Sequence, residues 1–228
     1  LKWAALALGG GIAFKLYPLF LLIPLISLGK NFFDRFKLVI LASLPYFLSI
    51  APYITSASFR STALFANQSS KSLYAAIPVS GGESILLFPL SLIFFYLLIL
   101  DKQSNKLDFW KLCLIPLLLF FTFTHYHPQW LIWITPFLIM DIVNNKFKNL
   151  LPIGLIFLSW LGSLFFFDPS LTIGLFTPLW FSLQSSPSIW VILNINPDYY
   201  LARSFLQTVL AVSSLYLIYS YGKRNTIL

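Results

Sequence analysis

Long apolar blocks separated by short polar connectors dominate the hydrophobic pattern of this 228-residue chain. Within the blocks there is neither the alternation of a half-buried strand nor the single apolar stripe of an amphipathic helix. Helices that are apolar all round are either deeply buried or face lipid. A chain of this size cannot bury so many of them in a water-soluble core, so the pattern predicts α-helices that have the bilayer as their solvent.

The lengths of these blocks set the expected number of membrane crossings. A helix needs about 20 apolar residues to span a bilayer, with a range of roughly 17–25. Seven blocks reach or approach that length: Trp3–Leu28, Leu38–Ile54, Ser84–Leu100, Leu107–Thr124, Pro128–Val143, Leu150–Phe167 and Leu201–Tyr221. We therefore expect an all-α, polytopic transmembrane bundle with residues 1–228 as a single transmembrane domain. Because Leu1 already lies in an apolar stretch, we interpret the chain as the C-terminal part of a longer protein.

Composition supports the same class of protein. Hydrophobic residues make up 58% of the chain and charged residues only 10%, which is too little charge to cover the surface of a soluble domain. The formal charge of +8 does not indicate nucleic-acid binding, because the basic residues lie in connectors between apolar blocks. The single cysteine, Cys113, lies within an apolar block, which excludes a disulfide framework and a cysteine metal site.

The basic residues also give the expected spans a direction. Ten of the fifteen Lys and Arg residues fall on one side when the spans alternate: Lys30, Arg35, Lys37, Lys102, Lys106, Lys111, Lys146, Lys148, Lys223 and Arg224. Connectors rich in Lys and Arg face the cytoplasm, so Leu1 and Lys2 are expected outside. We expect a multi-pass protein of the plasma membrane with an extracytoplasmic active face. Two long outer connectors, 55–83 and 168–200, carry few charges, and the Trp-containing segments of the second suit the membrane interface.

Lys15 is the first candidate functional residue, in the segment Gly9-Gly-Gly-Ile-Ala-Phe-Lys-Leu-Tyr-Pro18. An ionisable residue within a span is a functional hypothesis by default, and its ammonium could bind a phosphate or a carboxylate. If the glycine run instead breaks the helix, the span runs from Ile12 to Leu28, about 25 Å. Lys15 would then lie one turn inside the boundary and extend its charge to the interface. The sequence leaves both interpretations open.

A polar turn before the fifth span is the second candidate. It contains both histidines of the chain, His125 and His127, followed by Gln129 and Trp130. Imidazole and amide groups can hydrogen-bond to hydroxyls, and an indole ring can stack on a sugar. Two histidines without a nearby third ligand make a weak metal site. An aromatic belt at the membrane boundary explains the tryptophan better than it explains the histidines, so we favour a binding role.

The acidic residues give no catalytic pair. Glu83 is expected to cap the first turn of the third span, Asp141 to pair with Lys146 or Lys148, and Asp168 to start a turn. No two outer carboxylates lie close enough in sequence to indicate general acid–base chemistry. The chain also lacks a Walker loop, a dinucleotide fingerprint and a serine nucleophile elbow.

Two segments together resemble the GT-C superfamily of membrane glycosyltransferases, especially mannosyltransferase-like members that use polyprenyl-phosphate sugars. They are Phe14-Lys-Leu-Tyr-Pro-Leu-Phe-Leu-Leu-Ile-Pro24 and His125-Tyr-His-Pro-Gln-Trp-Leu-Ile-Trp-Ile-Thr-Pro136. In that family a K-x-Y-P segment ends in apolar residues and proline, and a later H-x-Q-Y/W-x-x-W-x-x-P segment opens a helix from the outer face. The resemblance covers these motifs and the helix layout, and Gln129 is followed here by Trp instead of the commoner Tyr.

The resemblance implies a GT-C-like glycosyltransferase that moves a sugar from a lipid-phosphate donor to an extracytoplasmic glycan, lipid or protein acceptor. Lys15 and Tyr17 would face the donor phosphate. The sugar or acceptor pocket would be lined by His125, His127, Gln129 and Trp130. The catalytic acidic residue of such enzymes lies in an outer loop that would precede Leu1, so no catalytic residue is assigned. The resemblance leaves a divalent cation open and fixes no cofactor.

Three other functions remain open. A transporter or flippase would have broken helices in repeat-related pairs and ionisable residues at the midplane, and only Lys15 approaches that description. A polysaccharide polymerase of the cell envelope would typically rely on outer arginines, of which this chain offers Arg60, with Arg203 at an edge. A membrane protein without chemistry is the third.

Overall fold

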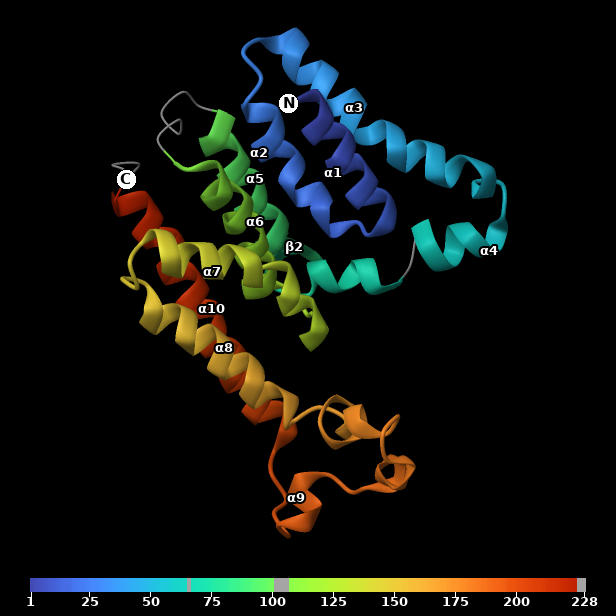
Figure 1. The fold of residues 1–228 in the computed structure, drawn as a ribbon, viewed down its shortest axis with the longest axis vertical. Helices are drawn as coiled ribbons and strands as arrows, with labels where there is room; N and C mark the ends of the chain where they lie inside the picture. The colour runs from blue at the N-terminus through green and yellow to red at the C-terminus, as the bar shows by residue number, and fades with distance from the viewer. Residues whose placement is uncertain (65–66, 101–106, 225–228) are drawn as a thin grey trace. The chain divides into compact units, whose positions relative to one another are not determined.

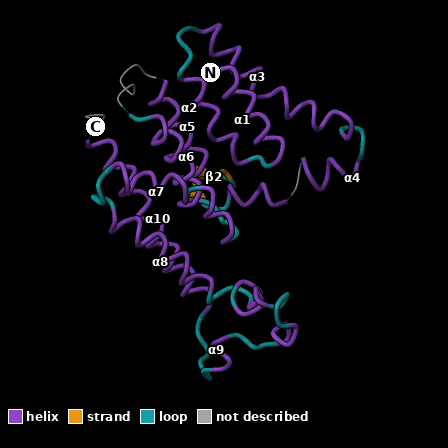
Figure 2. Tube along the Cα trace, viewed as in Figure 1, coloured by secondary structure: helices purple, strands orange, loops and turns teal. Residues whose placement is uncertain are grey.

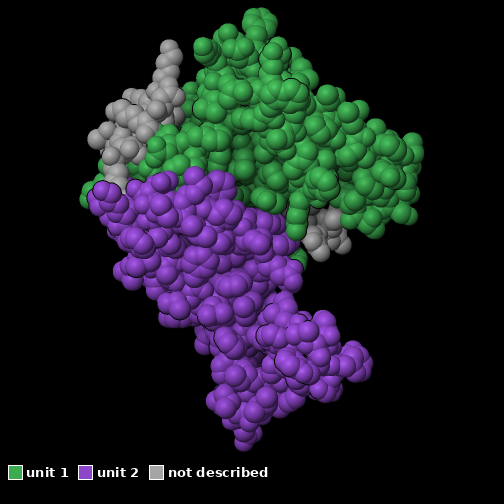
Figure 3. All heavy atoms as spheres, in the orientation of Figure 1, with its two compact units in different colours: residues 1–125, 221–228 green, residues 126–220 purple. Residues whose placement is uncertain are grey.

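The computed structural model describes residues 1–64, 67–100 and 107–224, and helices account for most of them (Figures 1 and 2). The expected helical class is therefore confirmed. The chain divides into two compact units (Figure 3): unit 1 contains residues 1–125 and 221–228, and unit 2 contains residues 126–220. Two basic residues of the expected cytoplasmic connectors, Lys102 and Lys106, lie outside the described residues.

Two helical segments of the described chain are long and apolar enough to cross a membrane, Phe32–Tyr53 and Tyr199–Lys223. They correspond to the second and seventh predicted spans. Six further apolar helical segments are shorter: Lys2–Phe14, Tyr17–Ser27, Leu87–Leu100, Phe109–Phe123, Thr135–Asn144 and Leu150–Leu164. The seven-span bundle as a whole stays a prediction.

Unit 1 contains most of the described helices and the only strands of the described chain. Its elements are α1 (Lys2–Phe14), the 3-10 helix η1 (Tyr17–Leu21), α2 (Leu22–Ser27), α3 (Phe32–Ile50), η2 (Ala51–Tyr53), α4 (Ala57–Phe59), the π-helical turn η3 (Arg60–Leu64), η4 (Asn67–Leu73), β1 (Ala76–Ser80), β2 (Glu83–Leu86), α5 (Leu87–Leu100) and α6 (Phe109–Phe123). The last turn of α10 also belongs to this unit.

The first apolar block is not a single span. Helix α1 passes through the glycine run and ends at Phe14, and Lys15 has extended backbone (φ −158°, ψ 137°). Pro18 explains the stop, because a proline lacks the N–H that would bond to the Phe14 carbonyl and its ring would clash with that carbonyl. The prediction of one helix over Trp3–Leu28 is therefore wrong, and so is the alternative in which the glycines break it.

Helix α2 folds back along α1, and both pack on α3 (Figure 1). Near the turn, Pro18 lies against Gly11. Further along, one apolar cluster combines residues of all three helices: Ala5 and Leu8 of α1, Leu22, Leu25 and Ile26 of α2, and Leu38, Leu41 and Ala42 of α3. Increasing numbers in α1 therefore meet decreasing numbers in α2, which is the pattern of an antiparallel pair.

Helix α1 runs parallel to α3 at close range. A Cβ atom added to Gly9 would overlap the Ala42 carbonyl oxygen and come within 2.8 Å of the Pro45 ring. Small residues allow two helix backbones to approach in this way. Since α1 and α3 start at the same end, Lys2 lies at the end of unit 1 where α2 connects to α3 through Lys30. The expectation that Lys2 and Lys30 lie at opposite ends is wrong.

A β-hairpin precedes α5. Strands β1 and β2 pair antiparallel, and Gly81 (φ 55°) and Gly82 (φ 93°) form the turn between them. Two positive φ values in a two-residue loop favour glycine strongly. Glu83 thus lies in a strand, and α5 begins only at Leu87, so the predicted helix cap at Glu83 is wrong.

Unit 2 contains η6 (Pro128–Trp133), α7 (Thr135–Asn144), α8 (Leu150–Leu164), η7 (Pro169–Leu171), η8 (Ile173–Phe176), η9 (Phe181–Ser185), α9 (Ile189–Ile192) and most of α10 (Tyr199–Arg224). Helices α7 and α8 form an antiparallel hairpin. The indole N–H of Trp160, near the end of α8, donates to the carbonyl of Pro128, which precedes α7, at 2.7 Å. Helix α10 lies along α8, where Leu206 faces Gly162.

Candidate functional site

Lys15 lies at the tip of the α1–α2 hairpin. Its backbone N–H still bonds to the Gly11 carbonyl at 2.9 Å, and its side chain is exposed. Tyr17 starts the following 3-10 helix and is half-buried. The proline that ends α1 therefore presents the Lys15 cation on a short non-helical segment and the Tyr17 phenol at the start of η1.

Aromatic contacts place this tip beside the ends of α5 and α6. The ring of Phe20 in η1 lies 5.4 Å from Phe88 in the first turn of α5 and 5.5 Å from Phe120 in the last turn of α6. The hydroxyl of Tyr96 donates to the Phe20 carbonyl at 2.9 Å. Helix α6 ends three residues after Phe120, and His125 follows. The Lys15–Tyr17 segment and His125 are thus at the same end of unit 1.

The histidine turn has extended backbone. Helix α6 stops at Phe123, where Thr124 turns extended (φ −118°, ψ 152°) and its hydroxyl donates to the Phe120 carbonyl at 2.7 Å. Exposure then alternates: His125, His127 and Gln129 are exposed, whereas Tyr126 and Pro128 are buried. Successive side chains of extended backbone point in opposite directions. Burial raises the pKa of the Tyr126 phenol, so this tyrosine stays neutral.

His127 and Trp130 each have a local partner. The Nδ1 atom of His127 accepts a long hydrogen bond, 3.5 Å, from the Gln129 backbone N–H. A neutral imidazole that accepts at Nδ1 can donate from Nε2. The Trp130 ring stacks on Trp133 at a centroid distance of 4.9 Å, so one of its faces is already covered.

The six predicted site residues fall into two sets. Lys15, Tyr17 and His125 belong to unit 1, and the other set, His127, Gln129 and Trp130, belongs to unit 2. The members of the second set are near neighbours in sequence, and a pocket that combines all six residues stays a prediction. No group of three or more His, Cys, Asp or Glu side chains that could hold a metal ion occurs among the described residues.

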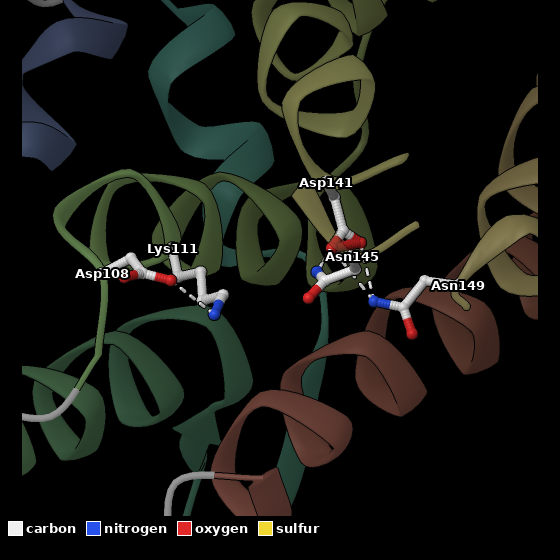
Figure 4. A network of polar contacts seen from close by, with 5 residues as sticks. All are labelled: Asp108, Lys111, Asp141, Asn145 and Asn149. Atoms are coloured by element: carbon white, nitrogen blue, oxygen red, sulfur yellow. Dashed lines mark hydrogen bonds and ion pairs between the residues drawn. The ribbon is translucent and has the colours of Figure 1, made fainter. Parts of the chain in front are cut away.

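A buried carboxylate was missed from the sequence. Asp141 in α7 is fully buried and accepts hydrogen bonds from the amide of Asn149, at 2.7 and 3.0 Å to its two oxygens, and from the amide of Asn145 (Figure 4). No described lysine forms an ion pair with it, so the predicted pairing with Lys146 or Lys148 is wrong. The spacing of these residues gave no signal in advance, because α7 ends at Asn144 and the chain reverses before Asn149.

This Asp141–Asn145–Asn149 network closes the α7–α8 hairpin. Lys146 and Phe147 have positive φ values, 50° and 62°, and reverse the chain between the two helices. Asn145 follows the last residue of α7 and Asn149 precedes the first residue of α8. The carboxylate of α7 therefore binds both ends of the turn, which is a structural role.

Two further acidic residues of the described chain, Asp108 and Asp168, have local roles. Asp108 pairs with Lys111 at 2.6 Å in the first turn of α6 (Figure 4). Asp168 accepts the Ser170 backbone N–H at 2.8 Å and starts η7, as predicted. That hydrogen bond, together with one from the Ser170 side chain, holds the pKa of the exposed Asp168 carboxyl below its ordinary value.

In comparisons with known proteins, no family model, no curated protein and no solved structure matches this chain.

Proposed function

We propose that this chain is part of an integral membrane glycosyltransferase, which moves a sugar from a lipid-phosphate donor to an acceptor outside the cytoplasm. The observation that carries the proposal is the position of Lys15. The break between α1 and η1 presents its ammonium on a non-helical tip, at the same end of unit 1 as His125.

The distribution of charge in unit 1 supports an outer location for this tip. Five described basic residues of unit 1 lie in or near the first turns of α1, α3 and α6, at the end opposite the tip: Lys2, Lys30, Arg35, Lys37 and Lys111; Arg60 and Lys71 lie in the connector between α3 and β1. Basic residues gather on the cytoplasmic side of membrane proteins. With Lys2 at the basic end, the charge asymmetry is stronger than the sequence indicated.

The apolar helices of unit 1 fit embedding in the bilayer, except that α1 is too short to span it. At 1.5 Å per residue, α1 is about 20 Å long, less than the ~30 Å of a hydrocarbon core. Many large apolar side chains of these helices are exposed, for example Phe14, Phe47 and Leu97, as expected of surfaces that face lipid. We infer that α1 and α2 form a re-entrant hairpin whose tip points toward the outer leaflet.

The proposed reaction is a displacement at the anomeric carbon. The bond from that carbon to the phosphate oxygen breaks while the acceptor oxygen bonds to it, and the lipid phosphate leaves with the added negative charge. Lys15 would stabilise that charge, and Tyr17 would donate to the same phosphate. A carboxylate or His125 would accept the acceptor's proton.

The test is sugar transfer by the full-length protein in membranes, from a panel of polyprenyl-phosphate hexoses. Lys15→Ala is expected to lower transfer by about 100-fold or more, the size of effect seen when one donor to a developing anion is removed. Lys15→Arg should retain part of the activity, because it keeps the charge. Lys2→Ala, at the opposite end of unit 1, is the matched control and should transfer normally. Undiminished transfer by a normally inserted Lys15→Ala protein would contradict the proposal.

The break at Lys15 also favours a second candidate, a transporter or flippase of a phosphate-linked lipid, since transporters bind substrates where helices are interrupted. Reconstituted vesicles separate the two functions. A transporter moves the lipid-linked sugar across the bilayer without any acceptor present, whereas a transferase releases free lipid phosphate only when an acceptor is added.

A further inference from the structure

The segment between α8 and α10 has an unusual composition for a connector. From Pro169 to Pro197 the sequence contains no charged residue and no histidine. Aspartates flank it on both sides, at positions 168 and 198. A connector that runs through water normally carries charged side chains, whereas this one contains the run Leu175–Phe181 and the helix α9, both rich in large apolar residues.

Those apolar side chains are exposed. In the run Leu175–Phe181, Leu179 is 73% and Phe181 78% exposed, and Trp180 is also exposed. In and after α9 the exposed group comprises Val191, Ile192, Leu193 and Ile195. Because this segment lies outside every predicted span, exposure to the hydrocarbon around a spanning helix does not explain it.

Hydrogen bonds and a ring stack attach this segment to the ends of α8 and α10. The indole N–H of Trp190 donates to the Phe165 carbonyl at 2.6 Å, and its ring stacks on Phe166 at 4.8 Å. Asp168 caps η7, and Asp198 accepts the backbone N–H groups of Tyr200 and Leu201 in the first turn of α10, at 3.0 and 2.9 Å. Thus Trp190 docks α9 against the end of α8, while its neighbour Val191 stays exposed.

The segment is continuous with a helix that can cross a membrane. It leads directly into Tyr199–Lys223, whose first turns expose Tyr200, Leu201 and Phe205. The Arg203 guanidinium lies 4.9 Å from the Phe167 ring and 5.1 Å from the Tyr200 ring. Aromatic and basic residues together are typical of the boundary between hydrocarbon and headgroups, and this end of α8 and α10 has that composition.

We propose that residues 169–197 form an interfacial platform, which lies flat in the headgroup region of the bilayer and inserts Leu175–Phe181 and the exposed side of α9 among the acyl chains. The partner is a lipid surface, and the absence of charge makes binding independent of anionic lipids. The proposal rests on the proposed membrane embedding of the chain. Tryptophan and other large apolar side chains are typical of segments that lie in this region, about 5–10 Å deep.

The test uses fluorescent probes on single cysteines in the full-length protein. Cys113→Ala removes the only cysteine of this chain, and Leu179→Cys, Gln184→Cys and Ile40→Cys each receive a probe; any upstream cysteine is also replaced. Each protein is placed in phosphatidylcholine nanodiscs and quenched with aqueous iodide or with lipids that carry a shallow spin label. Leu179 tests the platform, the exposed polar Gln184 is the matched control in the same segment, and Ile40 on the exposed side of α3 tests embedding itself.

We expect the Leu179 probe to show an iodide quenching constant about fivefold below that of the Gln184 probe, because a group about 5–10 Å below the surface is shielded from an aqueous anion. The shallow spin label should quench it strongly, also without anionic lipid. Iodide access at Leu179 with a shielded Ile40 probe would overturn the platform and leave embedding intact. Iodide access at Ile40 would overturn embedding. Shielding of Leu179 from both quenchers would indicate a protein partner or a second copy, and would also overturn the proposal.

Discussion

The α1–α3 pair of unit 1 and the α7–α8 hairpin of unit 2 are both built from strongly apolar helices, yet different groups hold each pair together. Helices α1 and α3 pack closely because Gly9 has no side chain, so the backbone of α1 can approach Ala42 and Pro45 of α3. Helices α7 and α8 are joined by the buried Asp141–Asn145–Asn149 network. One pair depends on shape and the other on hydrogen bonds.

The difference follows from how tightly each pair must fix the relative position of its two helices. In lipid, apolar surface gives helices no preference for one another over acyl chains, so association depends on close packing or on polar groups. Two parallel helices joined through a third, as in unit 1, can use close packing along several turns. A hairpin with a tight turn must fix one register at that turn, and a carboxylate with two amide partners does so. The comparison predicts that the two pairs fail under different substitutions.

The largest effect is expected at Asp141. Asp141→Ala removes three hydrogen bonds and leaves the buried Asn149 amide without them, which should cost about 3 kcal/mol in the free energy of unfolding. The measurement is the unfolding transition in detergent, monitored by helical circular dichroism. Asp34→Ala, an exposed aspartate in the first turn of α3, is the control and should cost about 0.5 kcal/mol.

A double substitution sharpens this prediction. If the network acts as a unit, Asn149→Ala should add little to Asp141→Ala, because the partner is already lost. Fully additive losses would show that the two side chains act independently and that the turn, not the network, fixes the hairpin.

The second effect is expected at Gly9. Gly9→Ala places a methyl group on the Ala42 carbonyl, and since that obstacle is backbone, α1 and α3 must separate, at a cost of about 2 kcal/mol. Gly10 is the matched control, because a Cβ there meets nothing within 4 Å. Gly10→Ala should stabilise the helix by about 0.5–1 kcal/mol through reduced backbone freedom. Equal effects of the two substitutions would refute the close contact.

Hydropathy located the helices of this chain better than it located their ends and directions. Helix α3 begins at Phe32, six residues before the predicted span, because Asp34, Arg35 and Lys37 lower the hydropathy without interrupting the helix. The reversal after α1 was missed because the apolar block continues through it. The informative residue was Pro18, placed four positions after the last residue of α1.

Two other features were missed, and only the first carried a signal in the sequence. Gly81-Gly82 between two short runs with β-branched residues is a hairpin pattern, but the adjoining apolar block extended the predicted helix into β2. The buried role of Asp141 depends on the positive φ values of Lys146 and Phe147, which bring Asn149 back to α7. No periodicity in the sequence gives that reversal.

The candidate site was predictable as a set of segments and not as a pocket. The sequence placed Lys15 and His125 toward one end, and the structure gathers them at one end of unit 1 through Phe20 and Phe120. The contact between the His127 Nδ1 atom and the Gln129 backbone N–H could not be predicted, because it depends on local geometry and not on residue type.

The smallest loss of stability is expected for Trp160→Phe, which tests whether the α7–α8 hairpin is held at its far end as well as at its turn. Trp160→Phe removes the hydrogen bond to the Pro128 carbonyl and keeps most of the ring, so the cost should be about 1 kcal/mol, below that at Asp141. Trp190→Phe, which also loses an indole hydrogen bond but where α9 contacts the end of α8, is the control.

If the network alone fixes the hairpin, Trp160→Phe should leave the unfolding transition unchanged while increasing hydrogen exchange at the N–H groups of Trp130 and Leu131. If both ends matter, the transition should shift with Trp160→Phe, and adding Asp141→Ala should give more than the sum of the two losses.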